Sequence, residues 1–322
     1  MMKTFTIILI GLSLGAVGQV PKDSSYNRQQ EFDKIRDRFP EAKIAAVELP
    51  EGVKQELDVV YLTILGTKYG DRELHADIFR PADERTYPAV IMVHGGGWKS
   101  GDKNLQWAIA QRLASRGFVT ICVEYQMLLE ALYPAAVYNL KAAIRWTRAH
   151  ADEYGIDRDR IAISGSSAGG QLALLVGLTT GVKGKEGNLG DFSYTSDIQA
   201  VIDMDGVVNF LGTYSLNRTR TPETVDAIWL GGYFHEKPET WKDASSLYWA
   251  NENSPPVMIL KSGYPRFTTG HYELLGLLSS WGIYNEVHQF DVEVHPFWLF
   301  DPWVDPTVGY MEAFLRKAFE GG

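Results

Sequence analysis

The 322-residue chain contains a single cysteine, Cys122, within the apolar run Val119 to Val123. An internal disulfide is therefore impossible, and we expect Cys122 to be buried in a core that supplies the stability. Positive charge is also scarce, because 31 Lys and Arg residues stand against 40 Asp and Glu residues for a formal net charge of −9. Such a chain lacks the general basic surface that binds phosphates, which argues against a nucleic-acid partner.

Long hydrophobic runs are absent as well, and the first apolar stretch is short. Lys3 precedes the apolar run Phe5 to Leu14, and Ala16-Val17-Gly18 supplies the small residues of a signal-peptidase site. This pattern predicts a signal peptide over residues 1–18 with cleavage before Gln19, and hence export to the periplasm or the medium. The run is too short to span a bilayer stably, although an uncleaved anchor is the alternative.

The remaining composition, 45% apolar and 22% charged, excludes disorder and predicts a folded body with a large core. Residues 19–56 form a polar N-terminal extension in which Phe32, Ile35 and Phe39 recur at helical spacing. This spacing predicts a short helix laid on the body. Nothing in the sequence indicates an oligomeric state.

A hairpin and a series of short apolar runs predict the fold class. The alternating runs Leu57 to Leu65 and Glu73 to Phe79 flank the turn signal Lys68-Tyr69-Gly70-Asp71. Helical patterns separate most of the later runs, which are Ala89 to Val93, Val119 to Val123, Ile161 to Ser164, Ala200 to Met204, Val257 to Leu260 and Tyr284 to Phe290. We therefore expect a mostly parallel sheet with helices on both faces, led by an antiparallel hairpin, as in the α/β-hydrolase fold.

One catalytic domain is predicted over residues 57–322. Within it, the segment Gly206 to Pro255 is rich in aromatic residues and proline and is too long for an ordinary connection. We interpret this segment as a cap or pocket wall.

The first motif that carries chemistry is Gly165-Ser166-Ser167-Ala168-Gly169. It lies between the predicted strand ending at Ser164 and an apolar helical segment. A serine at a sharp strand-to-helix turn projects its hydroxyl above the sheet, and flanking glycines avoid collisions there. The context predicts that Ser167 is a nucleophile; a tight turn without chemistry is the alternative.

The second motif, His94-Gly95-Gly96-Gly97-Trp98, follows the predicted strand Ala89 to Val93. Consecutive glycines allow backbone N–H groups to approach a developing oxyanion, and the helix after Ser167 adds its positive end. We expect His94 to be structural and Trp98 to line the pocket. The amides predicted to form the oxyanion hole belong to Gly96, Gly97 and Ala168.

A serine hydroxyl needs a base to accept its proton. Among the seven histidines, His295 follows the last predicted strand, where this fold places the base. His288 lies within that strand and is expected to be packed. The remaining histidines without a comparable position are His75, His150, His235 and His271.

The acid of the predicted triad is less obvious. The usual place, after the strand Val257 to Leu260, holds Lys261 to Phe267 and contains no carboxylate. Asp205, at the end of the strand Ala200 to Met204, stands at the same sheet edge and is our first candidate. The alternatives are Asp203, Asp291, Glu293, Asp301 and a dyad without an acid.

These motifs resemble the branch of the α/β-hydrolases that contains hormone-sensitive lipase and the feruloyl and acetyl-xylan esterases. The resemblance covers roughly Leu57 to Gly322 and is specific through Leu178. It departs at the missing acid and at Gln126, where arginine is common. The segments that carry it are the two motifs above, Val123-Glu124-Tyr125, Tyr133-Pro134-Ala135-Ala136-Val137 and Ala142-Ala143-Ile144-Arg145-Trp146.

The C-terminal part is similar to exported bacterial esterases that remove acyl or methyl groups from pectin and hemicellulose. The segments concerned are Tyr264-Pro265-Arg266-Phe267 and His295-Pro296-Phe297-Trp298-Leu299-Phe300. The resemblance implies an acyl-enzyme mechanism in which Ser167 attacks an ester carbonyl and His295 transfers the proton. No cofactor or metal is needed, and no zinc-ligand spacing or phosphate-binding glycine loop is present.

The predicted substrate contacts are Trp98, Trp298 and Arg266. Aromatic rings suit the apolar faces of sugars, and further aromatic residues crowd the same loops, namely Phe297, Phe300 and Trp303. Arg266 occupies the place of the missing acid and would bind a uronic-acid carboxylate or form a structural salt bridge. The net negative charge disfavours a polyanionic chain such as pectin unless the cleft is locally basic.

The sequence thus predicts an exported serine carboxylesterase that removes acetyl or similar groups from plant or algal polysaccharides or oligosaccharides. The second hypothesis is a general short-chain esterase, and a peptidase of the same fold is less favoured. A catalytically dead hydrolase used for binding is the third, because a fold does not guarantee activity.

Overall fold

The computed structural model describes residues 20–320. The predicted signal peptide over residues 1–18 lies outside the described residues.

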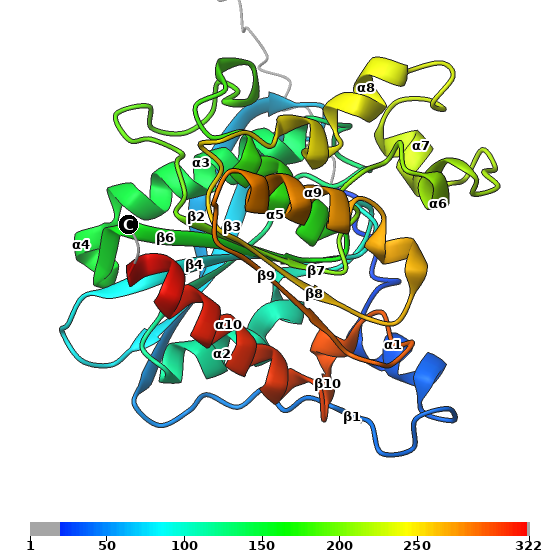
Figure 1. Cartoon of the computed structure of the whole chain (residues 1–322). Helices are drawn as coiled ribbons and strands as arrows, with labels where there is room; N and C mark the ends of the chain where they lie inside the picture. Colours follow the sequence, from blue (N-terminus) through cyan, green and yellow to red (C-terminus); the bar gives the residue numbers. More distant parts are fainter. Residues whose placement is uncertain (1–19, 321–322) are drawn as a thin grey trace, which may run out of the picture.

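A twisted central sheet organises these residues (Figure 1). Its strands lie in the order β2-β3-β5-β4-β6-β7-β8-β9; β2 pairs antiparallel with β3 and β3 with β5, whereas every pairing from β5 onward is parallel. The strands are β2 (Val53–Thr67), β3 (Gly70–Pro81), β4 (Tyr87–Val93), β5 (Val119–Val123), β6 (Ile156–Ser166), β7 (Ala200–Met204), β8 (Val257–Lys261) and β9 (Asn285–Gln289). The predicted hairpin and mostly parallel sheet are confirmed.

Helices cover both faces of the sheet (Figure 1). One face carries α3 (Ala135–Ala149), α5 (Ala168–Leu178) and α9 (His271–Ser280), and the other carries α2 (Trp107–Ser115) and α10 (Val304–Glu320). The short α4 (Ala151–Tyr154) precedes β6. The predicted N-terminal helix is α1 (Arg28–Ile35), which the Asn27 side chain caps. The segment after it forms β1 (Lys43–Ile44), which pairs with β10 (Phe300–Asp301).

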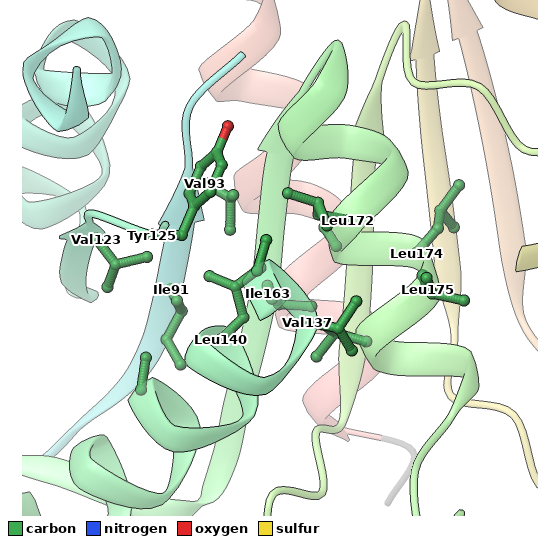
Figure 2. Packing of buried hydrophobic residues seen from close by; sticks show 14 of the residues in the cluster. Ile91, Val93, Val123, Tyr125, Val137, Leu140, Ile163, Leu172, Leu174 and Leu175 are labelled. Atoms are coloured by element: carbon green, nitrogen blue, oxygen red, sulfur yellow. The ribbon is translucent and has the colours of Figure 1, made fainter. Parts of the chain in front are cut away.

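Hydrophobic side chains of the strands pack under these helices. Figure 2 shows Val137 and Leu140 of α3 and Leu172 of α5 against Ile91 of β4 and Ile163 of β6, and all five are fully buried. Burying a side chain of this size stabilises the fold by roughly 1.5 to 3 kcal/mol relative to exposure. On the opposite side of the sheet the lone Cys122 is buried, as predicted, and burial raises the pKa of its thiol well above the usual range.

The segment between β7 and β8 contains α6 (Thr213–Leu216), α7 (Val225–Trp229) and α8 (Pro238–Asp243), grouped at one side of the body (Figure 1, yellow). Buried rings attach it to the body, because Trp229 stacks on Trp98 with ring centroids 4.7 Å apart, and Phe210 contacts the rings of Trp98 and Trp241. The segment therefore forms a packed wall beside the glycine-rich loop. Short 3-10 turns complete the element set: η1 (Lys103–Gln106), η2 (Lys183–Lys185), η3 (Ser246–Trp249), η4 (Pro265–Thr268) and η5 (Phe297–Leu299).

Candidate active site

Ser167 lies at the sharp turn between β6 and α5, with φ 54° and ψ −118°. This left-handed conformation is strained for a residue with a side chain, and the surroundings hold it. The turn is so tight that a Cβ on Gly165 would lie 2.0 Å from the Gly169 carbonyl oxygen, and a Cβ on Gly169 would lie 2.3 Å from that of Val93. Both flanking glycines are therefore required by close backbone approach, which is the geometry of a nucleophile elbow.

The structure brings the three predicted triad residues together. Nε2 of His295 lies 2.8 Å from Oγ of Ser167, and Nδ1 lies 3.0 Å from Oδ2 of Asp205. Because a carboxylate faces Nδ1, that nitrogen carries the hydrogen and Nε2 is free to accept the hydroxyl proton of Ser167. The imidazole is 20% exposed and the Asp205 carboxylate is fully buried.

Asp205 is held from the neighbouring strand. The backbone N–H of Ser262, just after β8, donates to Oδ1 at 2.8 Å, and the Ser262 hydroxyl donates to Oδ2 at 2.5 Å. A buried carboxylate needs such donors in place of water. Asp205 itself adopts φ 52°, so its turn is as constrained as that of the nucleophile.

The other candidate acids have different partners. Asp203 is fully buried, accepts the Gly206 N–H and lies 3.4 Å from His271, and burial raises its pKa. Asp291 accepts a hydrogen bond from Gln289. Glu293 pairs with Arg38 on the surface, and Asp301 belongs to the small sheet formed by β1 and β10.

The glycine-rich loop lies directly against the elbow. A Cβ on Gly95 would be 2.7 Å from the Ser166 carbonyl oxygen and 3.0 Å from Cβ of Ser167. Gly96 has φ +120°, and a Cβ there would collide with the Ser100 carbonyl oxygen at 1.9 Å. Gly97 has φ +61°, so the loop follows a path that side chains would strain.

The three amides predicted to form an oxyanion hole belong to this loop and to the helix that follows Ser167. Ala168 is the first residue of α5, so its N–H has no partner within the helix. Gly95 lies against Ser166 and Ser167, and Gly96 and Gly97 follow it directly in the loop.

His94 is structural, as predicted. It is 2% exposed, its Nδ1 contacts the Gly95 carbonyl oxygen at 2.7 Å, and its ring stacks on Tyr125 with centroids 4.6 Å apart. The Tyr125 hydroxyl donates to the His94 carbonyl oxygen at 3.0 Å. These contacts brace the start of the loop, and burial lowers the pKa of His94.

The aromatic residues after His295 correct the sequence prediction. Trp298 does not form a surface for sugars, because it is 1% exposed and meets the His295 ring edge-on at 5.1 Å. Phe297, Phe300 and Trp303 are likewise core residues. A proline turn and a 3-10 turn bend the chain inward here, and these rings fill the space under α10.

Two residues of the site were missed in the sequence reading. The Phe267 ring stacks flat on His295, with centroids 3.6 Å apart and planes 6° apart, and it is 9% exposed. Ser262 donates the two hydrogen bonds to Asp205. Both residues lie in the segment after β8, where the sequence analysis expects an acid. The position of this segment at the same sheet edge as His295 was the signal that could have identified them.

Trp98 and Arg266 line one cavity of about 150 Å³ next to Gly97. The Trp98 indole N–H donates to Oε1 of Gln171 in α5 at 2.9 Å, which ties this wall to the helix that begins after Ser167. Arg266 has no carboxylate within 4 Å among residues 20–320, so the alternative of a structural salt bridge is wrong.

Residues 20–320 contain no group of three or more His, Cys, Asp and Glu side chains placed to hold a metal ion. In the same part of the chain, no helix combines the length and the apolar character needed to span a membrane.

The sheet order, the elbow and the hydrogen-bonded Ser167, His295 and Asp205 define an α/β-hydrolase. The BD-FAE family model matches residues 76–264, and the chain belongs to this family. The match includes the glycine-rich loop, the elbow and Asp205, but it ends before His295.

The curated relatives are esterases. The chain is 33% identical over 202 residues to Esterase LipC of Mycobacterium tuberculosis, a match that covers 60% of this chain and 48% of LipC. It is 34% identical over 150 residues to an arylesterase of Saccharolobus solfataricus, covering 46% of each. The chain thus spans about half the length of the curated relatives it matches.

Solved structures agree on the fold. A truncated carbohydrate esterase from gut microbiota superposes with a TM-score of 0.71 at 22% identity and covers 85% of this chain and all of that one. A propionate-bound esterase of Thermogutta terrifontis superposes with a TM-score of 0.65 at 25% identity, covering 83% of this chain and 96% of that one.

Proposed function

We propose that the protein is a serine carboxylesterase that works through an acyl-enzyme. The observation that carries this proposal is the continuous line of hydrogen bonds from Ser167 through His295 to the buried Asp205. The esterase names of its relatives agree with it.

In the proposed mechanism, Nε2 of His295 takes the hydroxyl proton as Oγ of Ser167 attacks the ester carbonyl carbon. Asp205 keeps the hydrogen on Nδ1 and stabilises the imidazolium that forms. The carbonyl oxygen becomes an oxyanion facing the amides of Gly96, Gly97 and Ala168. His295 then returns the proton to the leaving alcohol, and a water activated by the same imidazole releases the acid.

We propose acylated carbohydrate as the substrate. The family resemblance in the sequence points to this class. Three aromatic side chains line the cavity beside Gly97, namely the buried Trp98 and Phe210 and the 62% exposed Tyr214. Aromatic faces of this kind suit sugar rings. A relative in fold is described as a carbohydrate esterase, and other relatives are described simply as esterases.

We further propose that the protein is exported. The support is the basic residue, apolar run and small-residue site within residues 1–18. N-terminal sequencing of protein recovered from the periplasm or medium tests this point: a mature chain beginning at Gln19 supports export, and an intact N-terminus on protein retained in the cytoplasm contradicts it.

The activity is tested with a fluorophosphonate probe and a set of esters. We expect a covalent adduct at Ser167 in the folded protein and turnover of 4-nitrophenyl acetate, both lost in Ser167→Ala. The control is Ser193→Ala, at an exposed serine, which should keep both. No adduct and no turnover in the folded wild-type protein would indicate a binding protein instead.

The substrate class is tested by comparison. We expect a higher kcat/KM on acetylated xylan or acetylated pectin oligosaccharides than on tributyrin, and no cleavage of a peptide amide. Equal or better turnover of tributyrin would indicate a general short-chain esterase.

A further inference from the structure

The cavity beside Gly97 carries a surplus of positive charge. Three arginines line it, namely Arg218, Arg220 and Arg266, and a single carboxylate, that of Asp226, stands against them. This local surplus of two positive charges occurs on a chain whose net charge is −9. The cleft is therefore basic where the rest of the molecule is acidic.

The single carboxylate of the cavity, that of Asp226, forms an ion pair with Arg220. Arg220 binds Asp226 through two hydrogen bonds, Nη2 to Oδ2 at 2.9 Å and Nε to Oδ1 at 3.2 Å, and both side chains are more than 90% buried. The same Arg220 guanidinium lies over the Trp241 ring at 4.6 Å. This pair is thus a fixed part of the wall, and it neutralises only one of the three arginines.

The other two arginines, Arg218 and Arg266, have little negative charge close to them. Arg218 reaches Asp226 only at 3.8 Å and is 40% exposed. Arg266 has no carboxylate within 4 Å among residues 20–320 and rests on the Phe267 ring at 4.8 Å. The three guanidinium groups line one cavity and repel one another, and desolvation together with the charges of Arg218 and Arg220 lowers the pKa of Arg266. An anion placed among them would relieve this repulsion.

Two residues of the cavity wall, Gly97 and Arg266, also adjoin the catalytic residues. Gly97, a predicted oxyanion donor, forms part of its wall, and the Phe267 ring that Arg266 contacts stacks on His295. Its remaining lining includes the rings of Trp98 and Phe210 and the side chain of Val225. These contacts favour a substrate that has its ester at Ser167 and an anionic group among the arginines.

We propose that Arg218 and Arg266 bind a carboxylate carried by the substrate next to its reacting ester. A guanidinium fork matches the two oxygens of a carboxylate, which is the anion that sugar acids and dicarboxylic acyl groups carry. The carboxylate has two possible sources: a uronic acid on the alcohol side of the ester, or a dicarboxylic acyl group on the acyl side. The inference rests on the proposed esterase function and narrows its substrate class.

The experiment compares two pairs of esters that differ in one carboxylate. The acyl pair is mono-4-nitrophenyl succinate and 4-nitrophenyl butyrate. The alcohol pair is an O-acetylated methyl glucuronide and the corresponding O-acetylated methyl glucoside. We expect the wild-type enzyme to prefer the carboxylate member of one pair by at least tenfold in kcat/KM, and that pair identifies the source. Salt should weaken the preference.

Variants locate the effect. Arg266→Gln and Arg218→Gln should each reduce this preference at least fivefold, mainly through KM for the carboxylate substrate. The control Arg158→Gln removes the same charge near the start of β6, at the opposite end of the strand from Ser167, and should leave the preference within twofold. Ratios near one in both pairs, or equal losses on both members of a pair in Arg266→Gln, would overturn the proposal.

Failure of the proposed esterase function can be recognised separately. The neutral esters and the fluorophosphonate carry no carboxylate, so their reaction tests the esterase activity independently of the arginines. If that activity is absent, calorimetric titration with glucuronate and with succinate decides the question. Binding of either anion that Arg266→Gln abolishes supports the carboxylate site, whereas no heat of binding from either anion overturns it.

Discussion

Ser262 donates two hydrogen bonds to Asp205, one from its backbone N–H and one from its hydroxyl. Ser262 follows β8, the position where the sequence comparison expects an acid, and Asp205 follows the adjacent strand β7. Parallel pairing of Met204 with Leu260 brings these two strand ends together. The acid thus lies one strand away from the expected position, and Ser262 at the expected position donates the hydrogen bonds that hold it.

The role of Asp205 leads to the first prediction. Asp205→Asn should lower kcat/KM for a neutral ester by about 10³ to 10⁴-fold, because the amide no longer holds the hydrogen on Nδ1 of His295. Steady-state kinetics on 4-nitrophenyl acetate measure this loss. Asp291→Asn is the matched control, since that side chain bonds only to Gln289 among the described residues, and it should keep a near-normal rate. The reverse result would assign the acid elsewhere.

The elbow glycines give a prediction about stability. Gly169→Ala should lower the free energy of unfolding by about 1 to 3 kcal/mol or more, because the new Cβ would lie 2.3 Å from the Val93 carbonyl oxygen. Gly276→Ala is the control: it lies within α9 with no atom within 4 Å of the new Cβ and should gain about 0.5 to 1 kcal/mol. Urea unfolding measures both, and equal effects would contradict the packing argument.

The burial of His94 leads to a prediction about how the stability of the protein depends on pH. Burial lowers its pKa in the folded state, so the unfolded chain binds more protons and stability falls as the pH drops below about 6.5. In His94→Gln the fall between pH 7 and pH 5 should be shallower, although the variant is less stable at pH 7 because the stack on Tyr125 is lost.

The control for this pH effect is His235→Gln, at an exposed histidine, which should preserve the wild-type slope. Denaturant titrations at several pH values provide the measurement. A slope unchanged in His94→Gln would show that other groups determine the acid sensitivity.

Substitutions of Trp298 and Trp98 distinguish a residue that positions His295 from a residue that contributes to substrate binding. Because Trp298 is buried edge-on against His295, Trp298→Phe should lower kcat several-fold and leave KM for acetylated oligosaccharides unchanged. Trp98→Phe, in the cavity wall, should instead raise KM, since it loses the bond to Gln171 and part of the wall. A raised KM in Trp298→Phe with an unchanged kcat would restore the binding role first predicted for it.

Much of the fold was predictable because its signals are local. Alternation of polar and apolar residues predicted the hairpin of β2 and β3, and short apolar runs predicted the parallel strands. The elbow and the glycine-rich loop could be predicted for the same reason. Close approach of two backbone segments leaves no room for side chains, so it requires glycine at fixed positions in the sequence.

Contacts between distant segments were not predictable in the same way. Both Trp98 and Trp298 looked equally suited to bind sugar, yet the chain path after His295 buries one and the wall segment leaves the other lining a cavity. Likewise, Arg218, Arg220 and Arg266 carry no common sequence pattern, and only the return of the segment between β7 and β8 gathers them.

The sequence by itself determined the class of the sheet, the nucleophile turn, the glycine-rich loop and the histidine after the last strand, because backbone sterics and strand order impose these on local residue types. The tertiary structure decided which carboxylate faces His295, which aromatic rings are buried and where the arginines converge. Those outcomes depend on the pairing of β7 with β8 and on the packing of the wall, which bring together residues that no local pattern connects.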